Sequence, residues 1–236
     1  MKMLAIDTST HVMSVGVGED NKLLGEYTTN FKKNHSVRLM PAIDHLLQEL
    51  NIQPADLDGI AVAKGPGSYT GVRIGITTAK SMAWALNIPV YAVSSLAVLA
   101  QNAKYFSGFI SPFMDARRGQ VYTGLYKADN GVVQLVEKDR IILLDDWLRL
   151  LKDKDKPVLF LGQDWDMHEH SIKEALQDKA WNGDFSSATP RTGELLQLAY
   201  TQGAPLSAHE VVPEYTQLTE AEKKWQAANK GKKKHE

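Results

Sequence analysis

The segment from Lys64 to Gly75 contains the residues best suited to bind a ligand through the protein backbone. Gly65 and Gly67 flank a proline, so a turn is expected there, because glycine accepts positive φ and proline fixes φ. Ser68 or Thr70 then caps a helix, whose free N-terminal N–H groups can bind a phosphate. The spacing matches neither the Walker A motif nor the dinucleotide fingerprint. A purely structural turn is therefore the alternative.

Two further turns place acidic, hydroxyl and basic side chains at the ends of apolar segments. The hydroxyls of the Asp7–Thr10 turn could contact a phosphate, and its aspartate could hold a magnesium ion through water. In the Asp115–Gly119 turn, two arginines could clamp a phosphate or bind carboxylates. An ordinary Asx turn and a charged hairpin are the respective alternatives. The candidate residues near a nucleotide are Asp7, Thr8, Ser9, Gly65, Gly67, Ser68, Arg73, Asp115 and Arg117.

The histidines are spaced unfavourably for a metal site. A metal-binding pair on one helix face needs histidines four residues apart, and the residue four after His35 is Leu39. His168 and His170 do not share a helix face, so both are expected to be exposed. No Ser/His/Asp arrangement or nucleophile elbow stands out. We therefore predict neither a metal site nor a catalytic residue.

The composition excludes several broad classes of protein. The 236 residues carry a formal net charge of −1, so no overall positive field attracts nucleic acid. Cysteine is absent, which excludes disulfides and thiolate chemistry. No apolar run approaches the roughly 20 residues of a membrane span, and the N-terminus has too short an apolar core for a signal peptide. With 43% hydrophobic residues the chain can form a sizeable core, and we expect a cytoplasmic protein.

Hydrophobic periodicity predicts an α/β fold for the first half of the chain. Three short strands form an antiparallel meander, after which helices and strands alternate. Because β-α-β crossovers join parallel strands, the helices should cover the sheet. The expected strands are residues 3–6, 11–17, 23–28, 60–63 and 90–93, and the expected helices are residues 36–50, 70–87 and 95–104.

A similar order of elements begins again near residue 109. The expected strands are residues 109–114, 120–126, 131–136, 140–143 and 157–161, and the expected helices are residues 145–151, 169–176 and 192–201. We therefore expect two related α/β lobes, residues 1–104 and residues 105–236, the second less regular. The lysine-rich end, residues 230–236, is expected to remain solvated and frayed.

The helix expected over residues 70–87 carries a small residue at every fourth position. Glycine inside a helix costs roughly 1 kcal/mol against alanine, so its two glycines suggest that another backbone approaches this face closely. We interpret this small-residue stripe (Gly71, Gly75, Ala79 and Ala83) as a surface for a partner helix, together with the apolar face of the 36–50 helix. The candidate interface residues are Met40, Ile43, Leu47, Gly71, Val72, Gly75, Ala79, Met82 and Ala83.

Several motifs occur in a fixed order along the chain. They are Asp-Thr-Ser-Thr at 7–10, His-Ser-Val-Arg-Leu-Met-Pro at 35–41, Lys-Gly-Pro-Gly-Ser-Tyr-Thr-Gly-Val-Arg-Ile-Gly at 64–75, Asp-Ala-Arg-Arg-Gly at 115–119, and Pro-Glu-Tyr at 213–215 followed by Glu-Ala-Glu at 220–222. In this combination the sequence closely resembles the bacterial TsaB (YeaZ) family over essentially its whole length. The 64–75 segment is highly specific, and the other motifs support it.

The resemblance implies an actin-like, Hsp70-like and sugar-kinase-like (ASKHA) fold of two ribonuclease-H-like lobes, with the second lobe reduced. It implies a role in forming N6-threonylcarbamoyladenosine in tRNAs that read codons starting with A. In that family TsaB is a non-catalytic accessory subunit that pairs with the catalytic subunit TsaD, and the ATPase TsaE joins the assembly.

The resemblance also concerns partners and cofactors. It implies that the 36–50 and 70–87 helices pack against equivalent helices of TsaD, or against a second copy as a homodimer when TsaD is absent. tRNA would be bound only through the complex, and no membrane is implied. No cofactor is implied either, and a bound nucleotide would lie at the interface with TsaD.

The sequence departs from its relatives at three points. Leu39 replaces the second histidine of the TsaD-type metal pair, and Gln217 stands where the TsaB family usually has arginine. The Asp7–Thr10 turn lacks the glycine-rich phosphate turn of the kinase-like relatives. We therefore expect no independent ATP hydrolysis. The alternative is a stand-alone ATP-dependent kinase or carbamoyl transferase that uses the cleft between Asp7 and Asp115.

Overall fold

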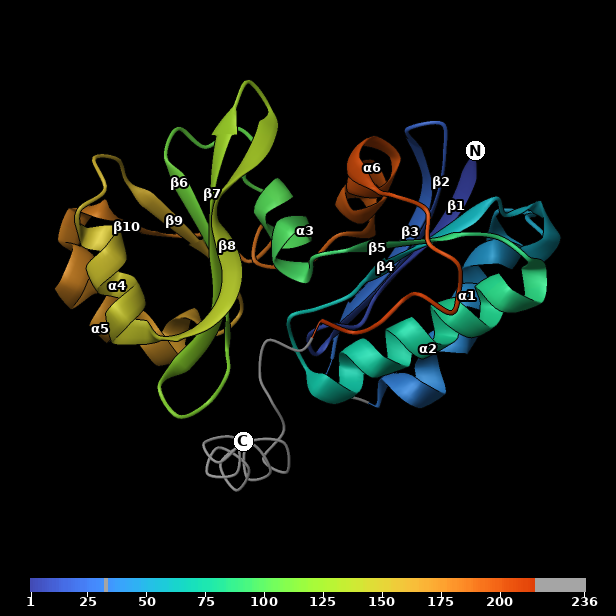
Figure 1. Ribbon diagram of the computed structural model, residues 1–236, viewed down its shortest axis with the longest axis horizontal. Coiled ribbons are helices and arrows are strands. Elements are labelled where there is room, and N and C mark those ends of the chain that lie inside the picture. Colours follow the sequence, from blue (N-terminus) through green and yellow to red (C-terminus); the bar gives the residue numbers. More distant parts are fainter. Residues whose placement is uncertain (32–33, 215–236) are drawn as a thin grey trace, which may run out of the picture.

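Two five-stranded mixed sheets form the centres of two lobes, as Figure 1 shows for the computed structural model. The structure describes residues 1–31 and 34–214. The features noted at Tyr215, Gln217 and 220–222, and the lysine-rich end, lie outside these residues. Within the described ranges, no helix combines the length and the apolar character of a membrane span.

The first sheet is built from the strands expected in the first half of the chain. They are β1 (Lys2–Asp7), β2 (Val12–Glu19), β3 (Lys22–Asn30), β4 (Gly59–Ala63) and β5 (Val90–Val93), with the short 3-10 helix η1 (Pro54–Asp56) before β4. β1 pairs antiparallel with β2 and parallel with β4, which gives the order β3-β2-β1-β4-β5. Helices α1 (His35–Glu49) and α2 (Tyr69–Leu86) cover one face, where their apolar side chains pack on Leu4, Ile6 and Val15.

The second sheet repeats this connectivity. Its strands are β6 (Phe109–Asp115), β7 (Gln120–Asp129), β8 (Val132–Leu143), β9 (Val158–Leu161) and β10 (Ala180–Asn182), in the order β8-β7-β6-β9-β10. Helices α4 (Leu144–Lys152) and α5 (Trp165–Leu176) cover one face, and η2 (Gln177–Lys179) leads into β10. The core on this face surrounds Phe113 and Trp147. The predicted α/β fold is confirmed, although β8 is one strand where two short segments were expected.

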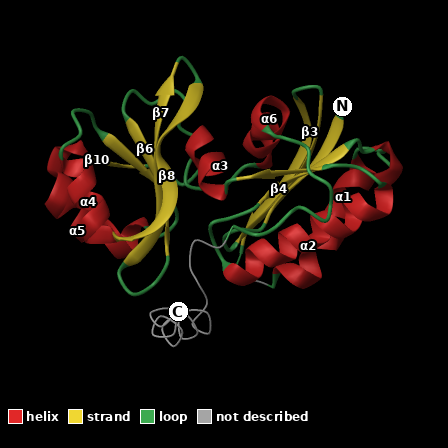
Figure 2. Cartoon of the chain, in the orientation of Figure 1, coloured by secondary structure: helices red, strands yellow, loops and turns green. Residues whose placement is uncertain are grey.

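The remaining helices, α3 (Ser95–Gln101) and α6 (Thr192–Gln202), lie between the sheets (Figure 2). α3 packs with Ile110 and Leu161 of the second sheet. α6 was expected in the second lobe, but it packs on the first sheet, where Leu195 and Leu196 contact the cluster around Met3. The strands therefore divide between the sheets near residue 105, whereas each of these helices covers the sheet of the other half.

Residues on β2 and β3 explain why α6 returns to the first sheet. A Cβ at Gly16 would overlap the side chain of Thr192, so glycine permits the close approach. The Oε2 atom of Glu26 accepts hydrogen bonds from the Gly193 N–H at 3.0 Å and from the Thr192 hydroxyl at 2.9 Å. The Glu26 carboxylate of the first sheet thus provides a hydrogen-bond acceptor for the N-terminus of α6, although α6 lies near the other end of the sequence.

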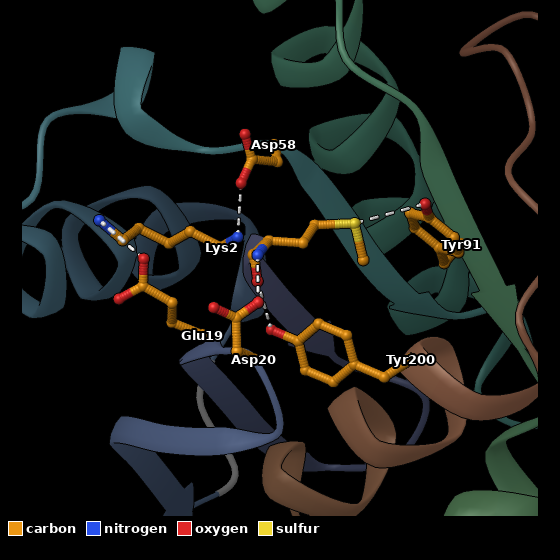
Figure 3. Close-up of polar contacts among 7 residues, drawn as sticks. Lys2, Glu19, Asp20, Asp58, Tyr91 and Tyr200 are labelled. Atoms are coloured by element: carbon orange, nitrogen blue, oxygen red, sulfur yellow. Dashed lines mark hydrogen bonds and ion pairs between the residues drawn. The ribbon is translucent and has the colours of Figure 1, made fainter.

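Contacts of the first two residues add to this attachment (Figure 3). The Tyr200 hydroxyl on α6 donates to the carbonyl oxygen of Met1 at 3.1 Å. The Lys2 N–H donates to Oδ2 of Asp58 at 2.6 Å, and the amino group of Met1 pairs with Asp20. Burial, with carboxylates nearby, raises the pKa of Tyr200 to about 12. The start of β1 is therefore held between α6 and the loop that precedes β4.

Candidate functional site

A cleft of about 710 Å³ opens between the two lobes. One wall consists of the turn after β1 and the glycine loop before α2; the other consists of the turn after β6 and the loop after β9. These segments follow the carboxyl ends of parallel strands, which is where open α/β sheets bind ligands. The residues lining the cleft include Ser9, Thr10, Gly67, Ser68, Asp115, Arg117, Tyr122, Gln163 and Asp164.

In the first wall, the glycine loop lies directly against the turn after β1. The Ser68 N–H donates to the carbonyl oxygen of Ser9 at 2.6 Å, and the Thr8 hydroxyl donates to the carbonyl oxygen of Gly71 at 2.7 Å. A Cβ at Gly67 or Gly71 would overlap the carbonyl oxygens of Ser9 and Thr8 respectively. The glycines thus permit close backbone approach, and the two segments form one continuous wall.

The N-terminus of α2 faces the cleft. Of the two predicted caps, Ser68 and Thr70, it is Ser68 that caps this 18-residue helix, because its Oγ accepts a hydrogen bond from the Gly71 N–H at 3.2 Å. The first helical residues, Tyr69 and Thr70, line the cleft. The positive end of the helix dipole therefore favours negative charge on this side of the cleft.

Asp7, the last residue of β1, is turned inward and is only 1% exposed. Its Oδ1 atom accepts hydrogen bonds from the N–H of Ser9 at 2.8 Å and from its hydroxyl at 2.7 Å. Its Oδ2 atom has no hydrogen-bond partner among the described residues. Burial raises the pKa of Asp7, against the opposing effects of the Ser9 hydrogen bonds and the nearby His35. Asp7 therefore shapes the turn and does not line the cleft.

Asp115 occupies the second wall at the end of β6 and connects the β6–β7 turn to α5. Its N–H donates to Oδ2 of Asp164 at 2.8 Å, and its Oδ2 accepts from the N–H of Arg117 at 3.2 Å. Its Oδ1 lies 3.3 Å from Nε2 of His168. The expectation that His168 is exposed is wrong, because α5 turns it toward β6, whereas His170 is exposed as expected.

The turn that follows Asp115 has an unusual backbone. Arg117, Arg118 and Gly119 have φ values of +65°, +56° and +70°. Tight hairpins need positive φ at their central residues, and asparagine or glycine usually supplies it. Arginine is uncommon in this conformation, which favours a role for the side chains. Arg117 lines the cleft.

The structure separates the residues predicted to lie near a nucleotide. Ser9, Gly67, Ser68, Asp115 and Arg117 line the cleft, whereas Asp7, Thr8 and Gly65 are buried behind it. Arg73 is exposed on α2, with its guanidinium 3.8 Å from the centroid of the Tyr69 ring. Contact of these residues with a nucleotide stays a prediction.

Sequence reasoning missed the part of the cleft contributed by the loop after β9. Gln163 and Asp164 line the cleft there, and Tyr122 on β7 joins them. Gly162 precedes them in the same place where the glycine loop follows β4. The repeated order of elements was therefore a usable signal for this loop.

The helix that carries His35 uses that residue and Leu39 for folding. His35 is 8% exposed, and its Nε2 donates to the carbonyl oxygen of Thr10 at 2.9 Å. Leu39 packs in the core between α1 and the first sheet. In the described ranges, no group of three or more His, Asp or Glu side chains is arranged to hold a metal ion.

The small-residue stripe of α2 faces the first sheet. A Cβ added at Gly75 would need to stand 2.5 Å from Oγ1 of Thr8 and 3.6 Å from Cγ2 of Ile6. The interpretation of the stripe as a surface for a partner is therefore wrong, because the stripe packs on the chain's own first sheet: at Gly71 the approaching backbone is that of Thr8 in the turn after β1, and at Gly75 the neighbours are the side chains of Thr8 and Ile6. Of the candidate interface residues, Ile43, Leu47, Gly71, Val72, Gly75, Ala79 and Ala83 are buried, Met82 is half-buried and Met40 is exposed.

The outward face of α1 and α2 carries a different set of apolar side chains. We define the outward face by Val37 and Met40 on α1 and by Trp84 on α2, which are 68%, 48% and 70% exposed. The two helices lie side by side on the sheet (Figure 1). Large exposed apolar side chains on neighbouring helices are typical of a protein–protein contact.

Two lobes of the same strand order, with a cleft between them, define the class of protein. This is the two-lobed α/β fold of the actin, Hsp70 and sugar-kinase (ASKHA) class. A close structural match is YeaZ from Pseudomonas aeruginosa, with a TM-score of 0.77 and 30% sequence identity over 91% of this chain and 99% of that chain.

Sequence comparisons narrow the class to a family. A family model described as TsaD, tRNA N6-adenosine threonylcarbamoyltransferase, matches residues 22–225. The chain is 50% identical to the tRNA threonylcarbamoyladenosine biosynthesis protein TsaB of Bacillus subtilis over 95% of this chain and 98% of that protein. It is 34% identical to TsaB of Escherichia coli over 60% of this chain and 62% of that protein. The chain belongs to the TsaB (YeaZ) family, as its motifs predicted.

Proposed function

We propose that the chain is a non-catalytic accessory subunit in tRNA threonylcarbamoyladenosine biosynthesis, where it binds and supports TsaD. The name of the B. subtilis relative supports the pathway. The match to the TsaD family model supports an origin shared with the transferase, and similar subunits readily pair through equivalent surfaces. We expect TsaE to join the complex, tRNA to bind only through the complex, and the assembly to act in the cytoplasm.

The outward face of α1 and α2 is the observation that carries this proposal. Val37, Met40 and Trp84 expose apolar surface that the chain's own core does not use. Burying such side chains against a partner removes apolar area from water, which drives association. TsaD is the proposed occupant, and a second copy of the chain would occupy the same face when TsaD is absent.

Asp7, His35 and Leu39 each make contacts that serve folding, although His35 also lines the cleft. Asp7 bonds to its own turn, His35 donates to a backbone carbonyl, and Leu39 packs in the core. The alternative, a stand-alone ATP-dependent kinase or carbamoyl transferase, is favoured by Asp115 in the cleft opposite the N-terminus of α2. Calorimetry of the purified chain with Mg-ATP separates the two, because micromolar binding with turnover would favour the enzyme.

Matched substitutions test the outward face. Met40→Asp on α1 and Trp84→Ala on α2 should each raise the dissociation constant for TsaD about 10- to 100-fold, as hot-spot truncations do. Met167→Asp and Trp181→Ala are the controls, because these residues are 68% and 53% exposed on the second lobe. Adenosine modification by the chain with TsaD, TsaE and tRNA should fall for the first pair alone. Undiminished TsaD binding by both Met40→Asp and Trp84→Ala would refute this face.

A further inference from the structure

A polar cluster joins the second sheet to the start of α3. Asp139 on β8 accepts a hydrogen bond from the Tyr126 hydroxyl on β7 at 2.5 Å and another from the Ser94 hydroxyl. Ser94 also caps α3, since its Oγ accepts from the Ala97 N–H at 3.2 Å. We name Asp139, Tyr126 and Ser94 the Asp139 latch. Asp139 and Tyr126 belong to the second sheet, whereas Ser94 directly follows β5 of the first sheet.

The next residue carries this connection to the glycine loop. Ser95 and Gly65 exchange two hydrogen bonds: the Gly65 N–H donates to Oγ of Ser95 at 3.1 Å, and the Ser95 N–H donates to the carbonyl oxygen of Gly65 at 3.0 Å. Gly65 opens the loop that ends at Ser68, the cap of α2. The path from Asp139 to α2 therefore consists of consecutive hydrogen bonds and a short loop.

The last described residue holds the same loop from its other side. Lys64 forms an ion pair with Glu214 at 2.9 Å, and the Glu214 N–H donates to the carbonyl oxygen of Lys64 at 2.9 Å. The Glu214 carbonyl oxygen lies 3.1 Å from where a Cβ of Gly65 would stand. Burial raises the pKa of Asp139, and among the nearby charges Glu214 raises it further while Lys64 lowers it.

We propose that Asp139 is a positioning residue that couples the second lobe to the N-terminus of α2. Through Ser94 and the Ser95–Gly65 pair, it sets where the glycine loop lies and hence where α2 begins. The inference rests on the proposed function only in its last step, where α2 presents part of the outward face to TsaD. The coupling inside the chain is independent of any partner.

Asp139→Ala tests the coupling at two levels. In the free chain, amide hydrogen exchange over residues 64–72 should become about tenfold faster, because the loop loses its link to the second lobe. With TsaD, the dissociation constant should rise about five- to tenfold, the low end of typical coupling between separate sites. Exposed Asp155, also in the second lobe, provides the control Asp155→Ala, which should change neither quantity.

Conservative variants keep the proposal testable if Asp139→Ala does not fold. Tyr126→Phe removes one hydrogen bond of the latch and should speed exchange over residues 64–72 by a smaller factor. Ser94→Ala removes the link to Asp139 together with the cap of α3, so it should speed exchange about as much as Asp139→Ala. Asp139→Asn keeps the shape and an acceptor for the Tyr126 hydroxyl, so it should behave nearly like the parent. Unchanged exchange in both Ser94→Ala and Tyr126→Phe, even with lower melting temperatures, would overturn the proposal, since the latch would then be a local stabilising contact.

The two proposals fail differently. If Asp139→Ala speeds exchange over residues 64–72 but neither it nor Trp84→Ala weakens TsaD binding, the coupling stands and the outward face is wrong. If Trp84→Ala weakens TsaD binding while Asp139→Ala changes neither exchange nor affinity, the outward face stands and the coupling is wrong.

Discussion

Asp7 and Asp115 occupy the same place in the two lobes, the end of the central strand, yet their surroundings differ. Asp7 is buried and bonds to its own turn through Ser9. Asp115 lines the cleft and connects to α5 through Asp164 and His168. The comparison shows that one topology can use equivalent acids for unlike purposes. The first lobe uses its aspartate to fold, while the second turns its aspartate toward the cleft.

Glycine, in contrast, has the same task in both lobes. A Cβ at Gly71 would overlap the carbonyl oxygen of Thr8, and a Cβ at Gly162 would overlap that of Phe113. We expect Gly71→Ala and Gly162→Ala each to lower the free energy of unfolding by about 3 kcal/mol, the upper end for overpacking, because backbone must shift. Urea denaturation measures this, with Thr77→Ala on the exposed side of α2 as control. If only one of the two substitutions lowered the free energy of unfolding, the glycines would not have the same role in the two lobes.

Replacing a buried serine in each sheet should lower the free energy of unfolding by different, smaller amounts in the two lobes. Ser111 in the second sheet accepts from Nε1 of Trp147 at 3.0 Å, and Trp147 is 1% exposed. Ser111→Ala should lower the free energy of unfolding by about 2 kcal/mol, since it leaves that buried N–H without a partner. Ser14→Ala in the first sheet should lower it by under about 1 kcal/mol, because Thr28 and Thr192 keep Glu26 as a partner.

A second substitution isolates the cause of the Ser111 effect. Trp147→Phe removes the N–H while keeping an aromatic ring, so Ser111→Ala should lose most of its effect in that background. Undiminished destabilisation in the Trp147→Phe chain would show that packing, and not the hydrogen bond, explains the loss.

The two aspartates should respond differently to replacement by asparagine. Because burial raises the pKa of Asp7 above its ordinary value of 3.8, the folded chain holds this proton more tightly than the unfolded chain. The free energy of unfolding therefore contains a favourable contribution from Asp7 at low pH that is lost as pH rises through its folded pKa. Asp7→Asn removes this titration, so its free energy of unfolding should fall less as pH rises. The difference in favour of Asp7→Asn over the parent should therefore be largest at neutral pH.

Denaturation at several pH values checks this expectation, with Asp115→Asn as the comparison. That change weakens the pairing with His168 and should lower the free energy of unfolding by about 0.5 kcal/mol. If the free energy of unfolding changed with pH in the same way for the parent and Asp7→Asn, burial would not disfavour the charged form of Asp7.

The sequence alone determined the family, the order of elements in the first half of the chain and the capped glycine loop. These follow from local signals: apolar periodicity places the strands and helices, Ser68 precedes a helix that begins at Tyr69, and the 64–75 motif is specific. That the first helix carries no histidine pair four residues apart is likewise read directly from His35 and Leu39.

Only the tertiary structure decided which surfaces face inward. Gly71 and Gly75 signalled a close approach, but whether a partner or the chain's own Thr8 makes that approach depends on contacts far apart in sequence. The same holds for α6, whose place on the first sheet depends on Gly16 and Glu26. Hydrophobic periodicity shows which face of a helix or strand is apolar, but it does not show which other element covers that face. That choice depends on how all the apolar surfaces of the chain pack together.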